Sequence, residues 1–315
     1  MRRLNKQTVV VACAAALIAV ALSTAADTPE GRSRFYVTAA GSELVQQGLA
    51  SPLPSGQEKA GFQAVPAPGV RFQANVAQAT TSPWVDSNAW RFQRGMRKAD
   101  YSKLAAGAAP LAAAEAFTYH ADAILNPDPA DVPELAKMLG FLKALDQPAL
   151  PAMANIGIVD DGSPVMGEVL NMLTRRNLLY RVVAKPDPKL DLSVRLGDRD
   201  FPKESANNPS DFAAVVRGKL GDDKRFVRLY GSNTAIAYLT GDGKRARLSV
   251  LSYSRNRSQA GLRVRVLGRY SPAKFAAYGV APDGGLADIE NPENATEFSV
   301  PAFNTIAVID LEAAK

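Results

Sequence analysis

The spacing of hydrophobic residues changes near residue 224 and divides the chain into two kinds of structure. Before this point apolar residues recur at helical intervals, whereas beyond it they alternate with polar residues as in half-buried strands. In the helical part, Asp131 is placed to cap a helix with Glu134 as its capping-box partner. The apolar face of that helix consists of Leu135, Met138, Leu139, Leu142 and Leu145.

A strand, a helix and a second strand follow one another closely between residues 156 and 183. Residues 156–159 (IGIV) and 178–183 are buried-strand patterns, and Ser163 and Pro164 suit the N-cap and first position of the helix between them. That helix has an apolar stripe of Val165, Met166, Val169, Leu170 and Leu173. Such a βαβ unit predicts a parallel sheet with a right-handed crossover, and we assign residues 81–224 to an α/β domain.

Residues 225–315 predict an antiparallel β-sandwich. Runs such as TAIAYLTG and RARLSVLSY stand at hairpin spacing, with a Gly-Asp-Gly turn between them. Alternation places five arginines on the outer face: Arg245, Arg247, Arg263, Arg265 and Arg269. A site for an anionic ligand is one explanation of this face. We favour a solvated or salt-bridged face, for which four acids are available: Asp288, Glu290, Glu293 and Glu297.

The first 80 residues contain a targeting segment and a segment of low hydrophobicity. Residues 1–26 have a basic start, an apolar run and small residues after it, which is the pattern of a secretory signal peptide. The apolar run is too short for a comfortable membrane span. We therefore expect a secreted or periplasmic protein with no membrane span in its mature chain. Residues 27–80, rich in glycine, proline, alanine, serine and glutamine, predict an extended, partly disordered arm.

The cysteine and histidine content excludes several kinds of chemistry. Cys13 is the single cysteine and falls inside the signal peptide, so the mature chain has no thiol nucleophile, disulfide or Cys-ligated metal. His120 is the single histidine, which rules out a His-based metal site, and we expect no metal and no cofactor. Loss of three basic residues with the signal peptide lowers the formal net charge from +6 to +3. Without a basic run, we expect no nucleic-acid partner.

The order of these elements resembles the rear portion of certain secreted carbohydrate-active enzymes. The IGIVDD strand, a helix, the LLYRVV strand and a sandwich ending in TEFSVPAFNTIAVIDLE cover residues 150–312. In those enzymes a class I glutamine-amidotransferase-like domain, similar to the trimerisation domain of some β-galactosidases, precedes a small β-sandwich. The resemblance implies a flavodoxin/amidotransferase-like parallel sheet and a homo-oligomer. Amidotransferase activity needs a cysteine nucleophile, which the mature chain lacks.

Glu115 is a lone acid in the helix predicted over residues 108–119. Its neighbours are small or apolar, so its carboxylate is either exposed or buried with a partner that offsets the cost of desolvation. We favour an ion pair with Arg91 or Arg94 over a catalytic role.

Asp160 and Asp161 follow the predicted strand 156–159 directly. Ligands of open α/β sheets bind beyond the carboxyl ends of the strands, so these carboxylates could hold a cation or sugar hydroxyls, or act as acid and base. The simpler interpretation is a strand-to-helix turn in which acids interact favourably with the helix dipole.

Both tryptophans stand in the stretch PWVDSNAWRFQR. Indole faces suit sugar rings and the polar residues between them suit hydroxyls, so we treat six residues as candidate ligands of a glycan: Trp84, Asp86, Asn88, Trp90, Arg91 and Arg94. The alternative is that the aromatic rings anchor the arm to the core. We expect one indole to be buried and the other to remain partly exposed, since residues six apart rarely face the same way.

Three functions are compatible with this sequence. The first is an exported non-catalytic protein that binds carbohydrate or assembles with copies of itself. The second is a glycoside hydrolase that uses two carboxylates from Glu115, Asp160 and Asp161. The segment 81–224 is too short for a full (β/α)₈ barrel of about 250 residues, which weakens this alternative. The third is a structural protein of the cell envelope.

Overall fold

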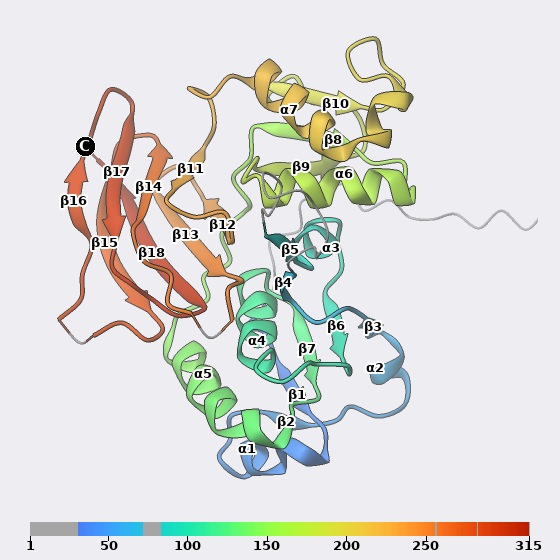
Figure 1. The fold of residues 1–315 in the computed structure, drawn as a ribbon, viewed down its shortest axis with the longest axis vertical. Coiled ribbons are helices and arrows are strands. Elements are labelled where there is room, and N and C mark those ends of the chain that lie inside the picture. The colour runs from blue at the N-terminus through green and yellow to red at the C-terminus, as the bar shows by residue number, and fades with distance from the viewer. Residues whose placement is uncertain (1–30, 72–82, 256, 282, 315) are drawn as a thin grey trace, which may run out of the picture.

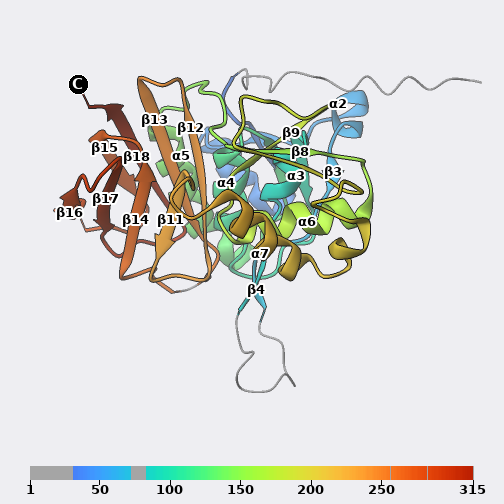
Figure 2. The same cartoon turned by 90° about the horizontal axis from the view of Figure 1, so that it is seen from above.

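Two parallel sheets and a β-sandwich make up the computed structural model, which describes residues 31–71, 83–255, 257–281 and 283–314 (Figure 1). The sandwich lies to one side of both α/β units in two perpendicular views (Figure 2). We call the α/β unit with the larger sheet the first unit and the one with the smaller sheet the second unit. The predicted combination of a parallel-sheet α/β part with antiparallel sheets is confirmed. The predicted signal peptide lies outside the described residues.

The first unit contains a five-stranded parallel sheet in the order β2-β1-β7-β6-β3. Its strands are β1 (Phe35–Val37), β2 (Ser51–Pro52), β3 (Gln63–Ala64), β6 (Lys98–Tyr101) and β7 (Asp122–Leu125). Its helices are α1 (Ser42–Gln46), η1 (Ala39–Gly41), α2 (Gly56–Ala60), α3 (Ala89–Gln93), α4 (Ala109–Thr118), η3 (Pro129–Asp131) and α5 (Val132–Ala144). All ten residues of α4 are buried, and its small alanine side chains allow this helix to lie inside the core.

The described part of the segment predicted as an extended arm is folded into this unit. Residues 31–71 supply three of the five strands, and β1 pairs in parallel with β7. A short hairpin adds β4 (Gly69–Arg71) to β5 (Trp84–Asp86). Strands of two or three residues leave no hydrophobic period in a sequence, and they form only where the fold brings another strand alongside them. The arm prediction is therefore wrong for residues 31–71.

The second unit is a three-stranded parallel sheet in the order β10-β8-β9. It consists of β8 (Ile156–Val159), β9 (Tyr180–Val183), β10 (Leu192–Arg195), α6 (Pro164–Arg175), η4 (Lys203–Asn207) and α7 (Pro209–Leu220). As predicted, Ser163 caps α6, where its hydroxyl accepts a hydrogen bond from Met166 N, and Pro164 begins the helix. In chain order the three strands read 2-1-3, as at the start of a flavodoxin-like sheet, whereas the larger sheet reads 2-1-5-4-3.

The sandwich packs two antiparallel four-stranded sheets, ordered β11-β14-β17-β16 and β12-β13-β18-β15. Their strands are β11 (Val227–Tyr230), β12 (Ala235–Gly241), β13 (Arg245–Ser252), β14 (Leu262–Leu267), β15 (Tyr270–Ala277), β16 (Ala287–Glu290), β17 (Ala295–Val300) and β18 (Ile306–Ala313). The sheet with β13 is buried on both faces. Leu248 and Val250 join the core between the sheets, whereas Leu251 and Tyr253 join the core of the first unit.

This double burial changes the prediction for the arginine face. Arg263 pairs with the predicted partners Glu290 (2.8 Å) and Glu297 (3.2 Å). Arg247, however, is buried, because the end of α5 covers it: it pairs with Asp310 at 2.6 Å and donates to the carbonyl of Asp146. Of the two predicted descriptions, a salt-bridged face therefore holds at that position and a solvated face does not.

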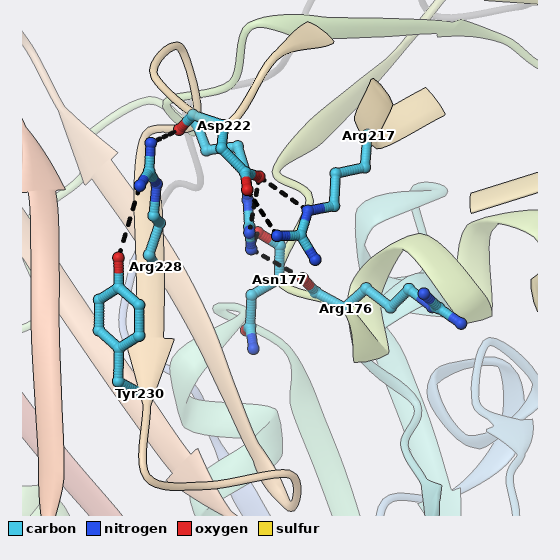
Figure 3. A network of polar contacts seen from close by, with 7 residues as sticks. Arg176, Asn177, Arg217, Asp222, Arg228 and Tyr230 are labelled. Atoms are coloured by element: carbon cyan, nitrogen blue, oxygen red, sulfur yellow. Dashed lines mark hydrogen bonds and ion pairs between the residues drawn. The ribbon is translucent and has the colours of Figure 1, made fainter. Parts of the chain in front are cut away.

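Hydrogen bonds from several arginines stabilise the loop between α7 and β11 (Figure 3). Arg217 on α7 donates to both carboxylate oxygens of Asp222, at 2.7 and 2.5 Å. Arg228 on β11 donates to the backbone carbonyl of Asp222, and Arg225 donates to that of Arg176 at 3.1 Å. The Arg217 hydrogen bond is the largest cause that holds the pKa of Asp222 well below its usual range.

We predict that Asp222→Asn lowers the free energy of unfolding at pH 7 by about 0.5–1 kcal/mol, the range of partly exposed ion pairs. The folded pKa of Asp222 is depressed, so its contribution is full above the unfolded pKa near 4 and is lost as the pH falls below it. In urea unfolding, the difference in the free energy of unfolding between parent and variant should be smaller at pH 3 than at pH 7. Asp223→Asn, at the exposed neighbouring position, is the control. A difference that is the same at both pH values would contradict this account.

Candidate functional site

Glu115 lies fully buried on α4 at the meeting point of three segments. Its Oε1 accepts hydrogen bonds from Asn88 N at 2.7 Å and from the Tyr253 hydroxyl at 2.7 Å. Ser87 Oγ lies 3.0 Å from the same oxygen and 2.7 Å from the Tyr253 hydroxyl. Its Oε2 accepts from the Tyr101 hydroxyl at 2.8 Å and from Asn88 Nδ2 at 3.1 Å. The carboxylate thus joins α4, the start of α3, the end of β6 and the sandwich.

Neutral hydrogen-bond donors, rather than the predicted arginine, offset the cost of desolvating the Glu115 carboxylate. Among the residues that the structure describes, neither Arg91 nor Arg94 forms an ion pair with it, and Arg91 instead donates to Asn88 Oδ1 at 3.2 Å. Burial, followed by the charge of Glu115, raises the pKa of Tyr101 and Tyr253 well above 10, so both phenols remain proton donors. Several such donors can stabilise a buried carboxylate without a second buried charge. The ion-pair prediction is corrected accordingly.

Asp160 and Asp161 are held in the turn between β8 and α6. We call residues 83–94, which contain both tryptophans, the tryptophan segment. Arg94 of this segment donates two hydrogen bonds of 2.6 and 2.7 Å to the carboxylate of Asp160, and Gly162 N donates to the same carboxylate at 2.9 Å. Asp161 accepts from Ser163 N at 2.9 Å, and hydrogen bonding by the Ser163 side chain, followed by this backbone N–H, holds the pKa of Asp161 below its usual value. These carboxylates belong to the second unit, whereas Glu115 belongs to the first.

Both indoles lie between the two α/β units and are half-buried against the core of the second. The Arg175 guanidinium covers the Trp84 ring at 3.8 Å, and the Arg91 guanidinium covers the Trp90 ring at 4.2 Å. Trp90 also faces Gly167, where a Cβ would come within 3.1 Å of the ring. We expected one buried and one partly exposed indole, and the expectation is wrong for the buried one, since both rings are partly exposed. The segment changes from strand β5 to helix α3 between them, and this bend lets both rings face the second unit.

The polar residues of the same segment are used within the protein. Asp86 pairs with Arg71, whose Nη2 lies 2.7 Å from Oδ1, while Asn88 and Arg94 hold Glu115 and Asp160 as described. None of the six candidate glycan ligands lines the cleft between the first unit and the sandwich. A glycan-binding role for them stays a prediction.

A cleft of about 340 Å³ separates the first unit from the sandwich, and we call it the interdomain cleft. It lies where the loops after β6 and β7 lead into α4 and α5, the side of a parallel sheet at which ligands bind. On the sandwich side it is bounded by the β13–β14 and β17–β18 loops and the end of β15. Residues from both sides form the lining: Gly107, Pro110, Leu111, Ala130, Asp131, Glu134, Ser252, Ser254, Arg255, Arg257, Ser258, Tyr278, Asn304 and Thr305.

The α5 side of the cleft is acidic. Asp131 and Glu134 do not form the predicted capping box: Asp131 instead accepts from Gly107 N at 2.7 Å, which ties the start of α5 to the loop before α4. Glu134 accepts from the Tyr278 hydroxyl at 2.6 Å, and this hydrogen bond is the main cause that lowers its pKa. Glu134 is therefore held in its ionised form, as a hydrogen-bond acceptor at the cleft.

The sandwich side of the cleft offers donors. Arg255 donates to the carbonyl of Ala106 at 3.2 Å, and Arg257 is exposed to solvent. Ser252 is 2% exposed, and its hydroxyl has no hydrogen-bond partner among the described residues. A buried hydroxyl without a partner is uncommon and calls for an explanation, of which a ligand is one. Sequence reasoning missed this side because its residues belong to loops, and the only signal was the polar run SYSRNRS after an apolar strand.

Two general properties of the described residues bear on function. They contain no group of three or more histidine, cysteine or acidic side chains placed to hold a metal ion. Within the same residues, no helix combines the length and the apolar character needed to cross a membrane.

Comparison with known proteins gives a likeness of fold. No family model matches the chain, and no curated protein matches it in sequence. Among solved structures, α-L-fucosidase isoenzyme 2 from Paenibacillus thiaminolyticus is similar with a TM-score of 0.52 and 8% identity, over 72% of this chain and 63% of that chain. The chain thus spans less than two thirds of the fucosidase. An α-amylase from H. orenii, with 11% identity over 72% of this chain and 51% of its own, has a TM-score of only 0.21 and carries no argument.

We predict that Glu115→Gln lowers the free energy of unfolding by about 2–4 kcal/mol, because a glutamine amide would turn one donor toward the donors that surround the site. Tyr253→Phe should cost about 1.5–3 kcal/mol, the range of hydrogen bonds to charged groups. Glu168→Gln, on the exposed side of α6, is the matched control and should change stability by less than about 0.5 kcal/mol. Urea midpoints measure all three. Equal midpoints for Glu115→Gln and the control would show that the buried carboxylate does not hold these segments together.

We also predict that Trp84→Ala and Trp90→Ala each cost about 2–3 kcal/mol, less than the 3–5 of a fully buried aromatic residue, since both rings are half-buried. Neither variant should change retention on immobilised polysaccharide. Loss of retention by a variant of unchanged stability would instead favour the glycan platform.

Proposed function

We propose that this protein is an exported, non-catalytic carbohydrate-binding protein and that the interdomain cleft is its sugar site. The observation that carries the proposal is the convergence of serine, asparagine, arginine, tyrosine and carboxylate side chains from two domains on one cleft. Sites for small ligands form preferentially between domains, and the cleft volume falls within their range of about 300–1,000 Å³.

The chemistry of the lining matches a polyhydroxylated ligand. Each sugar hydroxyl both donates and accepts, so a sugar site needs acceptors and donors close together. Asp131 and Glu134 supply acceptors, while Arg255 and Arg257 supply donors. The exposed side chains of Ser258 and Asn304 can do either. The fold likeness to a fucosidase is compatible with a carbohydrate-active relation, without deciding between binding and catalysis.

Binding is favoured over glycoside hydrolysis by the state of the carboxylates. A hydrolase needs a general acid whose pKa is raised so that it remains protonated. Tyr278 lowers the pKa of Glu134 at the cleft. Of the carboxylates first considered for hydrolysis, Glu115 is enclosed and Asp160 is gripped by Arg94.

We further propose that the protein is exported and that its second unit mediates assembly of identical copies. Export rests on the signal-peptide pattern of residues 1–26. The second unit is proposed to be flavodoxin/amidotransferase-like and to mediate assembly of identical copies. Its 2-1-3 strand order supports this, as do two valines exposed on its helices, Val165 on α6 and Val215 on α7.

We predict that Ser258→Trp, which fills the mouth of the cleft, abolishes retention of the mature protein by the sugars it binds on a glycan array. Ser271→Trp, on the exposed edge strand β15, should leave retention unchanged. Incubation of the retained glycans with the mature protein should release no new reducing ends. Release of reducing ends would favour the hydrolase alternative. Retention by no glycan at all, or equal retention by both variants, would contradict the proposal.

A further inference from the structure

The arginines of the interdomain cleft differ from most others of the sandwich in their partners. Four sandwich arginines form ion pairs with acids: Arg245 with Asp242, Arg247 with Asp310, Arg263 with Glu290, and Arg265 with Glu297. Among the described residues, Arg255 and Arg257 form no ion pair, although Asp131 and Glu134 line the same cleft. Two positive charges therefore line the cleft with no described carboxylate within ion-pair distance of either.

We infer that the sugar bound in the cleft is an acidic one, whose carboxylate or sulfate group is held by Arg255 and Arg257. This inference rests on the proposed function and names the class of its ligand. A guanidinium presents a planar fork of N–H donors that matches the oxygens of a carboxylate or sulfate.

The orientation of Arg255 is fixed before any ligand arrives. Its Nη1 donates to the carbonyl of Ala106, and its Nε lies 3.0 Å from the point that a Cβ on Gly69 would occupy. The absence of a side chain at Gly69 thus leaves room for the guanidinium against β4. A group that is already oriented loses less conformational entropy on binding.

The acidic side of the cleft sets the direction of the ligand. Asp131 and Glu134 would repel an anionic group and accept hydrogen bonds from hydroxyls, so the hydroxyl face of the sugar turns toward α5. The acidic group then turns toward the β13–β14 loop.

Calorimetric titration of the mature protein with tetragalacturonate and with its fully methyl-esterified form tests the inference. The ester keeps the ring and its hydroxyls and removes the charge, so we expect it to bind at least tenfold more weakly. The difference should shrink at 0.5 M salt, because mobile ions screen exposed charges. Sulfated galactotetraose against plain galactotetraose repeats the comparison for sulfate and shows which acidic group is preferred.

Arg257→Gln should weaken binding of the preferred acidic probe about tenfold and that of the uncharged probe by a much smaller factor, so that the preference for the acidic probe falls. Arg245→Gln, an exposed arginine remote from the cleft lining, is the matched control. Arg255→Gln should act in the same way as Arg257→Gln, and circular dichroism verifies that each variant is folded. If Arg257→Gln and Arg255→Gln kept the full preference for the acidic probe over the uncharged one, the inference would be overturned.

The two proposals fail differently. Binding of uncharged probes at least as tightly as the acidic ones, blocked by Ser258→Trp, would overturn the acidic-sugar inference and leave the sugar site in place. Binding of no sugar on the glycan array would overturn the proposed function and the inference with it.

Discussion

The buried carboxylate of Glu115 is the contact on which the arrangement of the three parts depends. It is removed from water, so the cost of its desolvation must be offset by donors held in place by the fold. Those donors come from the tryptophan segment, from the end of β6 and from Tyr253 next to β13. A displacement of any one of these segments would leave a buried charge short of a partner, which favours a single arrangement of the first unit against the sandwich.

This contact also places the interdomain cleft. Tyr253 reaches inward to Glu115, while its neighbour Ser252 lines the cleft, so one backbone segment serves both the core and the candidate site. The sheet that contains β13 is buried on both faces, which fixes the β13–β14 loop opposite the start of α5. The bonds from Tyr278 to Glu134 and from Arg255 to Ala106 then join the two sides of the cleft directly. The loops that line the cleft are thus held in place by hydrogen bonds across it and by the packed strands and helices next to them.

The sequence predicted those elements whose hydrophobic pattern extends over several turns or strand pairs. The helices α5 and α6, the strand β8 and the alternating strands of the sandwich belong to this class. Three-residue strands such as β1 were missed because pairing with β7, and not local pattern, makes them strands. The sequence allowed Glu115 to be buried, but the partners predicted for it were wrong. Its tyrosine partners, such as Tyr253, are distant along the chain, and the local sequence around Glu115 does not indicate them. The cleft was missed for a related reason: its residues converge from segments more than 140 positions apart, as Glu134 and Tyr278 do.

Hydrogen–deuterium exchange of the mature protein, with and without the sugar that it retains most strongly, tests the central claim most directly. Exchange slows where a ligand covers or steadies the backbone. The account predicts slowed exchange in residues 130–134, 252–258 and 303–305, which border the interdomain cleft, with little change in residues 84–94. Slowed exchange confined to residues 84–94, with the cleft segments unchanged, would contradict it.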